Sequence, residues 1–454
     1  MSKVLRFGGV LAATLVLLAP ALWNRFPLIQ YDTGGYLARW YEGYLVPSRS
    51  TVYGLFLTVL QHPDFWLVVV VQAALTVWML ALLLRVFGFG ERLSLLFAVT
   101  LSLSVFTTLP WLTSILLTDI FAGLSVLALH LLVFCDDKLR RFERGGLIAL
   151  IAFGAATHSA TFAVLIALLA AMALAWRVLK AGAAAGLVRG TAAIALGAAL
   201  LVGANYAVAG RVAWTPGGVA LAFGRMLQDG IVARYLAEHC PDRRFRLCNH
   251  RHELPDDADV YFWGESVFDQ LGRFKGLDPE MRTIVFESLA AYPAWQAEAA
   301  VVAFGRQLVR NATGEGVVPS AWHTQGMIAE HTPAAVPSMR AARQQRGELD
   351  FSAINRIHEP VALAAMVLLA ALAFAGRRRE GLSDFGWLAA TATTALIANA
   401  AVCGILSNPH DRYGARLVWI APLVVGLAAL RLYRQRQRAA LPVSKALQFP
   451  PHTG

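Results

Sequence analysis

The residues best suited to chemistry lie in short polar stretches that interrupt an otherwise apolar sequence. An ionisable side chain at or within a membrane is costly, so each is by default a functional candidate. Together these stretches offer carboxylate, imidazole and guanidinium groups. The candidates are Asp32, Arg49, Asp119, His158, His410, Arg412 and Tyr413.

Transfer of a group from a lipid phosphate is the chemistry that these side chains suit. A carboxylate can take the proton of an incoming hydroxyl as a general base, and arginine is well shaped to hold a departing phosphate. We predict Asp32 as the base. Asp119 either orients the acceptor or completes a divalent-metal site with Asp32. The predicted phosphate-binding residues are Arg49, His158, His410, Arg412 and Tyr413.

Five of these candidates also have a purely structural interpretation. Asp32 precedes a Thr-Gly-Gly sequence and could start a turn, and Asp119 could be a helix N-terminal carboxylate that the helix dipole favours. His158 could cap a break between two helices, whereas Arg412 and Tyr413 could be anchors at the membrane interface. The functional interpretation therefore depends on whether the fold brings these residues together.

The composition predicts the elements that must position them. Of 454 residues, 57% are hydrophobic and 15% are charged, against about 25% charged in a typical soluble domain. Apolar runs long enough to cross a bilayer core recur along the chain, which predicts an all-α polytopic membrane protein with about ten transmembrane helices. The net charge of +11 comes from short basic clusters between these runs. Such clusters are typical of cytoplasmic loops, so nucleic-acid binding is not supported.

The basic clusters also predict the orientation of the chain. With ten crossings, every cluster at a short loop or terminus falls on one side of the membrane. Both termini are then cytoplasmic, in a bacterial-type cytoplasmic (inner) membrane, and Asp32, Asp119, His158 and Arg412 lie at the outer side. This assignment of loops to the two sides of the membrane depends on two short helices meeting at His158. A single longer crossing there would place every later loop on the opposite side.

The apolar runs form two groups on either side of one large polar region. The predicted parts are an N-terminal transmembrane module (1–209) with a catalytic first outer loop (24–64), a mainly helical periplasmic domain (210–358), a C-terminal three-helix transmembrane module (359–438) and a cytoplasmic tail (439–454). We expect the periplasmic domain to recognise the acceptor because of its position. Residues 10–23 are the predicted first membrane helix, with a cleaved signal peptide as the alternative.

Two of the four cysteines, Cys240 and Cys248, lie in the large polar region. Their spacing allows a small disulfide loop if this region faces an oxidising space. The neighbouring His239, His250 and His252 leave a zinc site as an alternative, and a pair of free thiols is a third.

Three short motifs in roughly the first 210 residues are similar to motifs of a known family. They are Asp32 followed by Arg49-Ser50-Thr51-Val52-Tyr53-Gly54-Leu55-Phe56-Leu57, Thr118-Asp119 at an outer helix end, and Ala155-Ala156-Thr157-His158 at a helix break. This pattern resembles the GT-C superfamily of membrane glycosyltransferases, which includes protein mannosyltransferases and the enzymes that add aminoarabinose to lipid A. The family more often has Arg or Lys at the position of His158.

The resemblance implies that Asp32 is the catalytic base, that the donor is a polyprenyl-phosphate-linked sugar, and that transfer inverts the anomeric carbon. It names neither the sugar nor the acceptor, which is a lipid, a glycan or a protein. A lipid or glycan transporter (flippase) and a glycan polymerase or ligase are the alternatives. Asn205 and Asn399 within helices would suit a transporter, but the second half of the chain shows no repeat of the first.

Overall fold

The computed structural model describes residues 3–43, 45, 47–216, 218–379 and 381–440 of the 454-residue chain. Within these residues the protein is all-helical and has no β-strand, which confirms the predicted helical class. One isolated parallel bridge joins Leu28 and Ile115. Most of the predicted cytoplasmic tail, residues 441–454, lies outside the described residues.

Six helical segments are long and apolar enough to cross a membrane, as expected for an integral membrane protein. Three shorter apolar helices accompany them: α1 (Lys3–Leu17), α6 (Leu93–Phe106) and α8 (Asp119–Phe134). The six are α5 (Trp66–Val86), α10 (Ser159–Leu179), α11 (Ala184–Ala209), α20 (Ser352–Ala375) with the turn after it, α21 (Ser383–Leu406), and α22 (Asp411–Val418) with α23 (Ile420–Ala440).

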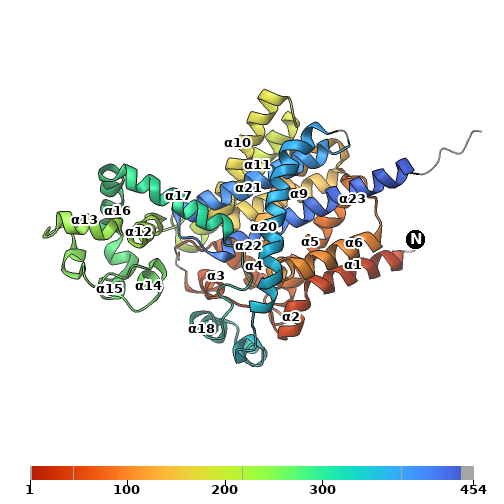
Figure 1. Ribbon diagram of the computed structural model, residues 1–454. Coiled ribbons are helices and arrows are strands. Elements are labelled where there is room, and N and C mark those ends of the chain that lie inside the picture. The colour runs from red at the N-terminus through yellow and green to blue at the C-terminus, as the bar shows by residue number, and fades with distance from the viewer. Residues whose placement is uncertain (1–2, 44, 46, 217, 380, 441–454) are drawn as a thin grey trace, which may run out of the picture.

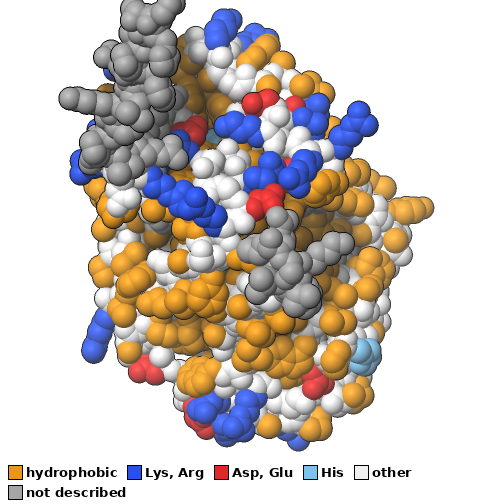
Figure 2. Space-filling model, turned by 90° about the vertical axis from the view of Figure 1, so that its right-hand side faces the viewer, with side chains coloured by type: hydrophobic (Ala, Val, Ile, Leu, Met, Phe, Trp, Pro, Cys, Tyr) orange, Lys and Arg blue, Asp and Glu red, His pale blue; other side chains and the backbone are white. Residues whose placement is uncertain are grey.

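The outer surface of this helical part is apolar. Figure 2 shows a broad belt of hydrophobic side chains across the middle of one face, with Lys and Arg side chains gathered above it and a smaller set of charged side chains below it. Leu101, Leu174, Val367 and Phe374 are among the large side chains that stay exposed. An apolar surface of this extent needs an apolar environment, which a bilayer provides.

Helix α8 lies at the centre of the helical part. Every residue from Asp119 to Val133 is buried, and the helix packs against α9 (Arg141–Thr157), α11 and α21. A helix that is apolar all round is stable where other helices surround it. Small residues allow the close approach that membrane helices favour, since a Cβ atom at Gly154 on α9 would collide with Ser125 on α8.

The large polar region between α11 and α20 consists of two structurally distinct parts. The first is a lobe with its own apolar core, on the left of Figure 1, whereas the N-terminus and the end of α23 lie on the right. We call its helices, which are drawn in green, the outer lobe. They are α12 (Gly218–Gln228), α13 (Ile231–His239), α14 (Ala258–Trp263), α15 (Val267–Gln270), α16 (Arg273–Ala291) and the start of α17 (Pro293–Val309).

The second part, residues 311–351, packs against the N-terminal helices instead. It contains α18 (Trp322–His331) and α19 (Val336–Arg340). Its Gln344 side chain receives a hydrogen bond from Ile29 N at 3.1 Å and donates to Ile29 O at 2.7 Å. The predicted periplasmic domain (210–358) therefore includes one part that forms a separate lobe and one that packs around residues 24–64, the predicted first outer loop.

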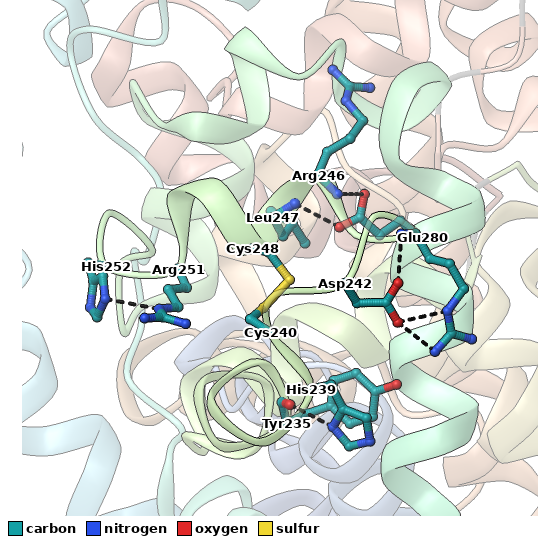
Figure 3. Close-up of a disulfide and its surroundings, with 11 residues drawn as sticks. Tyr235, His239, Cys240, Asp242, Arg246, Leu247, Cys248, Arg251, His252 and Glu280 are labelled. Carbon is teal, nitrogen blue, oxygen red and sulfur yellow. Dashed lines mark hydrogen bonds and ion pairs between the residues drawn. A yellow bond between two sulfur atoms is a disulfide. The ribbon is translucent and has the colours of Figure 1, made fainter.

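A disulfide between Cys240 and Cys248 closes a short loop in the outer lobe (Figure 3). The loop is held on α16, because Glu280 accepts hydrogen bonds from Arg246 N and Leu247 N at 3.1 and 2.8 Å. His239 stacks on a tyrosine of its own helix instead of facing the sulfurs. The described residues contain no group of three or more metal-ligating side chains, so the zinc alternative has no support.

Candidate functional site

The first turns of α3 (Tyr31–Glu42) and α8 are brought together by a short backbone pairing. Leu28 N donates to Ser114 O and Leu116 N donates to Leu28 O, both at 2.9 Å. The Thr33 hydroxyl in the first turn of α3 adds a bond to Leu116 O at 3.1 Å. Because α8 begins only three residues later, the N-terminal ends of two helices lie beside each other. Carboxylates are favoured at such ends, and each end carries one.

Two glycines let other elements approach the start of α3. Gly34 N donates to the hydroxyl of Thr324 on α18 at 2.8 Å, and a Cβ atom at Gly34 would lie 2.7 Å from Thr324 Cα. A Cβ atom at Gly35 would lie 3.2 Å from Arg49 Cγ. The Gly-Gly pair is thus a packing requirement for α18 and for the stem of Arg49.

Asp32, Arg49 and Arg412 form a group that we call the clasp. Arg49 pairs with Oδ1 of Asp32, and Arg412 Nη1 lies 2.8 Å from Oδ2. The carboxylate is 12% exposed and each arginine side chain is 16% exposed. Burial by itself raises the pKa of Asp32, but the charges of Arg49 and Arg412 outweigh it and lower this pKa to about 2.

The segment after Arg49 fixes the position of this arginine. The Ser50 hydroxyl caps α4 (Thr51–Val59) and donates to Ala156 O on α9 at 2.8 Å. Thr51 is bonded to Asn205 on α11 at 2.7 Å, and the Tyr53 hydroxyl donates to Gln72 on α5 at 3.1 Å. The polar side chains that follow Arg49 therefore anchor its backbone to three different helices.

Glu315 fixes the backbone of Arg412, the second arginine of the clasp. This carboxylate accepts a bond from Arg412 N at 2.7 Å and lies 2.9 Å from His410 Nδ1. On its other side, His410 Nε2 lies 3.3 Å from Asp259 of the outer lobe. Burial lowers the pKa of His410, but the two carboxylates outweigh it and raise this pKa above 6.5. His410 thus links the outer lobe to the clasp.

His158 lies at the break between α9 and α10, as the sequence predicts. Its Nδ1 accepts a bond from Ala160 N at 3.2 Å and lies 3.3 Å from a guanidinium nitrogen of Arg416. Both neighbours are donors only, so Nδ1 carries no proton and the ring is neutral. In this structure His158 caps α10 and orients Arg416, and it does not add a positive charge.

Arg416 is a fully buried cation that the sequence analysis missed. Its guanidinium donates to Asn399 at 3.0 and 2.5 Å and to Cys403 at 3.3 Å. No carboxylate among the described residues forms an ion pair with it. Asp119 interacts with Arg416 electrostatically but makes no direct ion pair with it. A buried charge without a direct ion-pair partner is unfavourable, so a further anion beside Arg416 would be favoured. The sequence signal that could have identified Arg416 is its spacing of four residues from Arg412, which puts both arginines on one helix face.

Glu315, by contrast, gives no signal in the sequence, because a single acidic residue between two glycines has no recognisable spacing. Only its contacts with His410 and Arg412 reveal its position behind the clasp. Tyr413 lies under the same arginine, whose guanidinium carbon is 5.1 Å from the ring centroid. This geometry is that of a cation–π contact.

Asp119 is buried and lines a small cavity, of about 40 Å³, together with Arg412 and Glu315. Among the described residues, no group donates a hydrogen bond to its carboxylate. Asp119 does not join Asp32 in a cluster of metal ligands within the described chain, and arginines hold both oxygens of Asp32. The divalent-metal alternative is therefore not supported by the donor set.

A larger apolar pocket, of about 390 Å³, lies beside the small cavity. We call it the side pocket. It shares Trp111 and Phe351 with the small cavity. Its rim reaches the surface, since Trp23, Val105 and Ile357 are 46, 49 and 44% exposed. The side pocket is formed by α1, α2 (Ala19–Asn24), α6, α7 (Leu109–Ser114) and the beginning of α20.

Comparisons of the chain with protein-family models, with curated proteins and with solved structures gave no match. Any functional conclusion therefore depends on the chemistry of the site itself. That site combines buried cations, the carboxylates of Asp32, Asp119 and Glu315, and an adjoining apolar pocket.

Proposed function

We propose that this protein is a membrane glycosyltransferase of GT-C type, which moves a sugar from a polyprenyl-phosphate donor to an acceptor at the outer face of a bacterial-type cytoplasmic membrane. One observation carries the proposal. The small cavity lined by Arg412 and Asp119 adjoins the apolar side pocket, through Trp111 and Phe351. A phosphate with an isoprenoid tail combines the two chemistries that this pair of cavities suits.

The cations supply the phosphate-binding half of the argument. Arg49 and Arg412 face one carboxylate, and Arg416 is buried with neutral partners. Guanidinium groups bind phosphate oxygens through two parallel hydrogen bonds. The side pocket supplies the apolar half, because its exposed rim would let a long tail continue into the bilayer.

In the proposed reaction an acceptor hydroxyl attacks the anomeric carbon of the donor sugar while Asp32 takes the hydroxyl proton. A bond forms between the acceptor oxygen and the anomeric carbon. The bond from that carbon to the phosphate oxygen breaks, and its electron pair stays on the phosphate. Arg49 and Arg412 stabilise the added negative charge. Attack from the side opposite the leaving group inverts the configuration at the anomeric carbon. Asp119 orients the acceptor.

The proposal includes ten crossings with both termini in the cytoplasm. Six apolar segments, together with the shorter α1–α2, α6–α7, α8 and α9, amount to ten crossings. The N-terminus and the end of α23 lie on the same side in Figure 1, opposite the outer lobe. The disulfide in that lobe favours an oxidising space on its side.

Binding of an isoprenoid phosphate tests the proposal. The protein in lipid nanodiscs is titrated with farnesyl phosphate, farnesol and inorganic phosphate. We expect farnesyl phosphate to bind at least about tenfold more tightly than either fragment, since it uses both the cations and the side pocket. Arg412→Gln should remove this advantage, whereas Arg282→Gln on the exposed face of α16 should keep it. Equal binding of farnesol, or an unchanged affinity in Arg412→Gln, contradicts the proposal.

A further inference from the structure

We infer that the clasp is opened by the phosphate of the donor: the phosphate takes over the guanidinium groups of Arg49 and Arg412, and this releases Asp32 to act as the base. The inference deepens the proposed function and rests on it. It assigns to the same three residues both the recognition of the donor and the timing of proton transfer.

The closed clasp leaves Asp32 poorly suited to accept a proton. Oδ1 already accepts from Arg49 and Oδ2 from Arg412, so each oxygen has one lone pair left for a hydroxyl and shares its charge with a guanidinium group. A carboxylate with a pKa of about 2 also has little driving force to take a proton from an alcohol. In the closed clasp, Asp32 is therefore inactive as a base.

The charge balance explains why a phosphate would compete for these arginines. Arg49, Arg412 and the buried Arg416, on the same helix face as Arg412, supply three positive charges. Asp32 and Asp119 supply two negative charges, since the Asp119 carboxylate interacts electrostatically with Arg412 and Arg416, and Glu315 pairs with His410. The site therefore keeps an excess of one positive charge. An incoming phosphate satisfies this excess and offers guanidinium groups more acceptor oxygens than a single carboxylate does.

The arginines can change partner while their backbones stay in place. Arg412 N is fixed by Glu315, and its guanidinium already divides its bonds between Asp32 and Gln30, at 2.8 and 2.6 Å. The stem of Arg49 packs closely against Gly35, and its guanidinium group already divides its contacts between Asp32 and Ser48 O, the latter at 3.4 Å. A shift of the two guanidinium groups between partners therefore opens the clasp.

The clasp closes again after each transfer. Once the arginines hold the phosphate, its negative charge beside Asp32 raises the pKa of this carboxyl and favours uptake of the hydroxyl proton. After transfer, the lipid phosphate leaves with the electron pair of the broken bond. The arginines then return to Asp32 and lower its pKa, which expels the proton to solvent.

The direction in which the Asp32→Asn substitution changes the affinity for phosphate tests this inference. If Asp32 competes with phosphate for the arginines, Asp32→Asn should bind farnesyl phosphate and inorganic phosphate about tenfold more tightly than the wild type. If Asp32 merely holds the arginines ready for phosphate, the same variant should bind more weakly. Asp256→Asn removes the same charge from an exposed turn of the outer lobe and should leave binding unchanged.

The outcomes separate the two hypotheses. Weaker or unchanged phosphate binding by Asp32→Asn, with wild-type binding intact, overturns the clasp inference and leaves the proposed function standing. If wild-type protein binds farnesyl phosphate no better than farnesol, both are overturned. A second measurement does not depend on the folding of the variant. In wild-type protein labelled with carbon-13 aspartate, phosphate should shift one carboxylate band in the infrared difference spectrum, and the absence of a shift contradicts the inference.

Discussion

The clasp and the outer lobe use charged residues in opposite ways. In the clasp, Asp32 meets arginines that are 17 and 380 residues away in the sequence, in a largely buried site. The outer lobe contains pairs that are local and exposed, such as Asp269 with Arg273, four residues apart and 41 and 45% exposed. Exposed pairs contribute little to stability. The comparison shows that burial and convergence, and not the number of charges, distinguish a candidate site.

The strongest test of this difference is loss of transfer in Asp32→Asn. General-base catalysis contributes roughly 10²–10⁴-fold, so we expect a fall in transfer of at least about a hundredfold. The measurement is sugar transfer in membranes that contain equal amounts of each variant. Asp256→Asn, in the outer lobe, should keep wild-type transfer. Wild-type transfer by Asp32→Asn would contradict the assignment of Asp32 as base.

Removal of the disulfide should affect the outer lobe and leave the clasp unchanged. The two cysteines are separated by 8 residues, for which loop closure predicts a loss of about 2–3 kcal/mol. In the double variant Cys240→Ser, Cys248→Ser, hydrogen exchange should increase in α13 and in the loop up to Cys248. Exchange at α3 and α22 should stay the same. Increased exchange at α3 would instead show that the two regions unfold together.

The link between the outer lobe and the clasp should weaken as the pH rises above 6.5. The pKa of His410 is raised above 6.5 by Glu315 and Asp259. Its contribution to stability is therefore fully present below pH 6.5 and is lost as the pH rises through the raised pKa. We expect the unfolding temperature to fall over this interval, and His410→Gln to flatten the fall. An equally steep pH dependence in His410→Gln would remove this residue from the link.

The smallest effect is expected for the local pair of the outer lobe. Asp269→Asn removes an exposed partner of Arg273, which should cost at most about 1 kcal/mol of stability. Farnesyl phosphate binding should not change. A loss of binding in this variant would mean that the exposed charges of the lobe also belong to the site.

Much of the helical architecture follows from local sequence. The break at His158 was predicted, because an interruption of an apolar run is a local signal. Asp32 and Arg412 were predicted as candidates for a similar reason, since a charge in an apolar setting is conspicuous. Their contact across 380 residues was only a hypothesis until the fold was known.

Other features were not readable from the sequence. Glu315 is an unremarkable acid in a polar stretch, and its importance comes only from lying between His410 and Arg412 N. The division of residues 210–358 into a lobe and a segment around the first loop was also missed. Both parts are polar and helical, so composition does not distinguish a surface that faces water from one that packs on α3.

The sequence by itself determined that the chain is a helical membrane protein and which ionisable residues stand out, because hydrophobicity and helical periodicity act over short stretches. The tertiary structure decided the rest. It closed two arginines on Asp32, left Arg416 without a direct ion pair among the described residues and brought an apolar pocket beside the cavity of Asp119. These contacts join segments that are far apart in the chain, and only packing determines such neighbours.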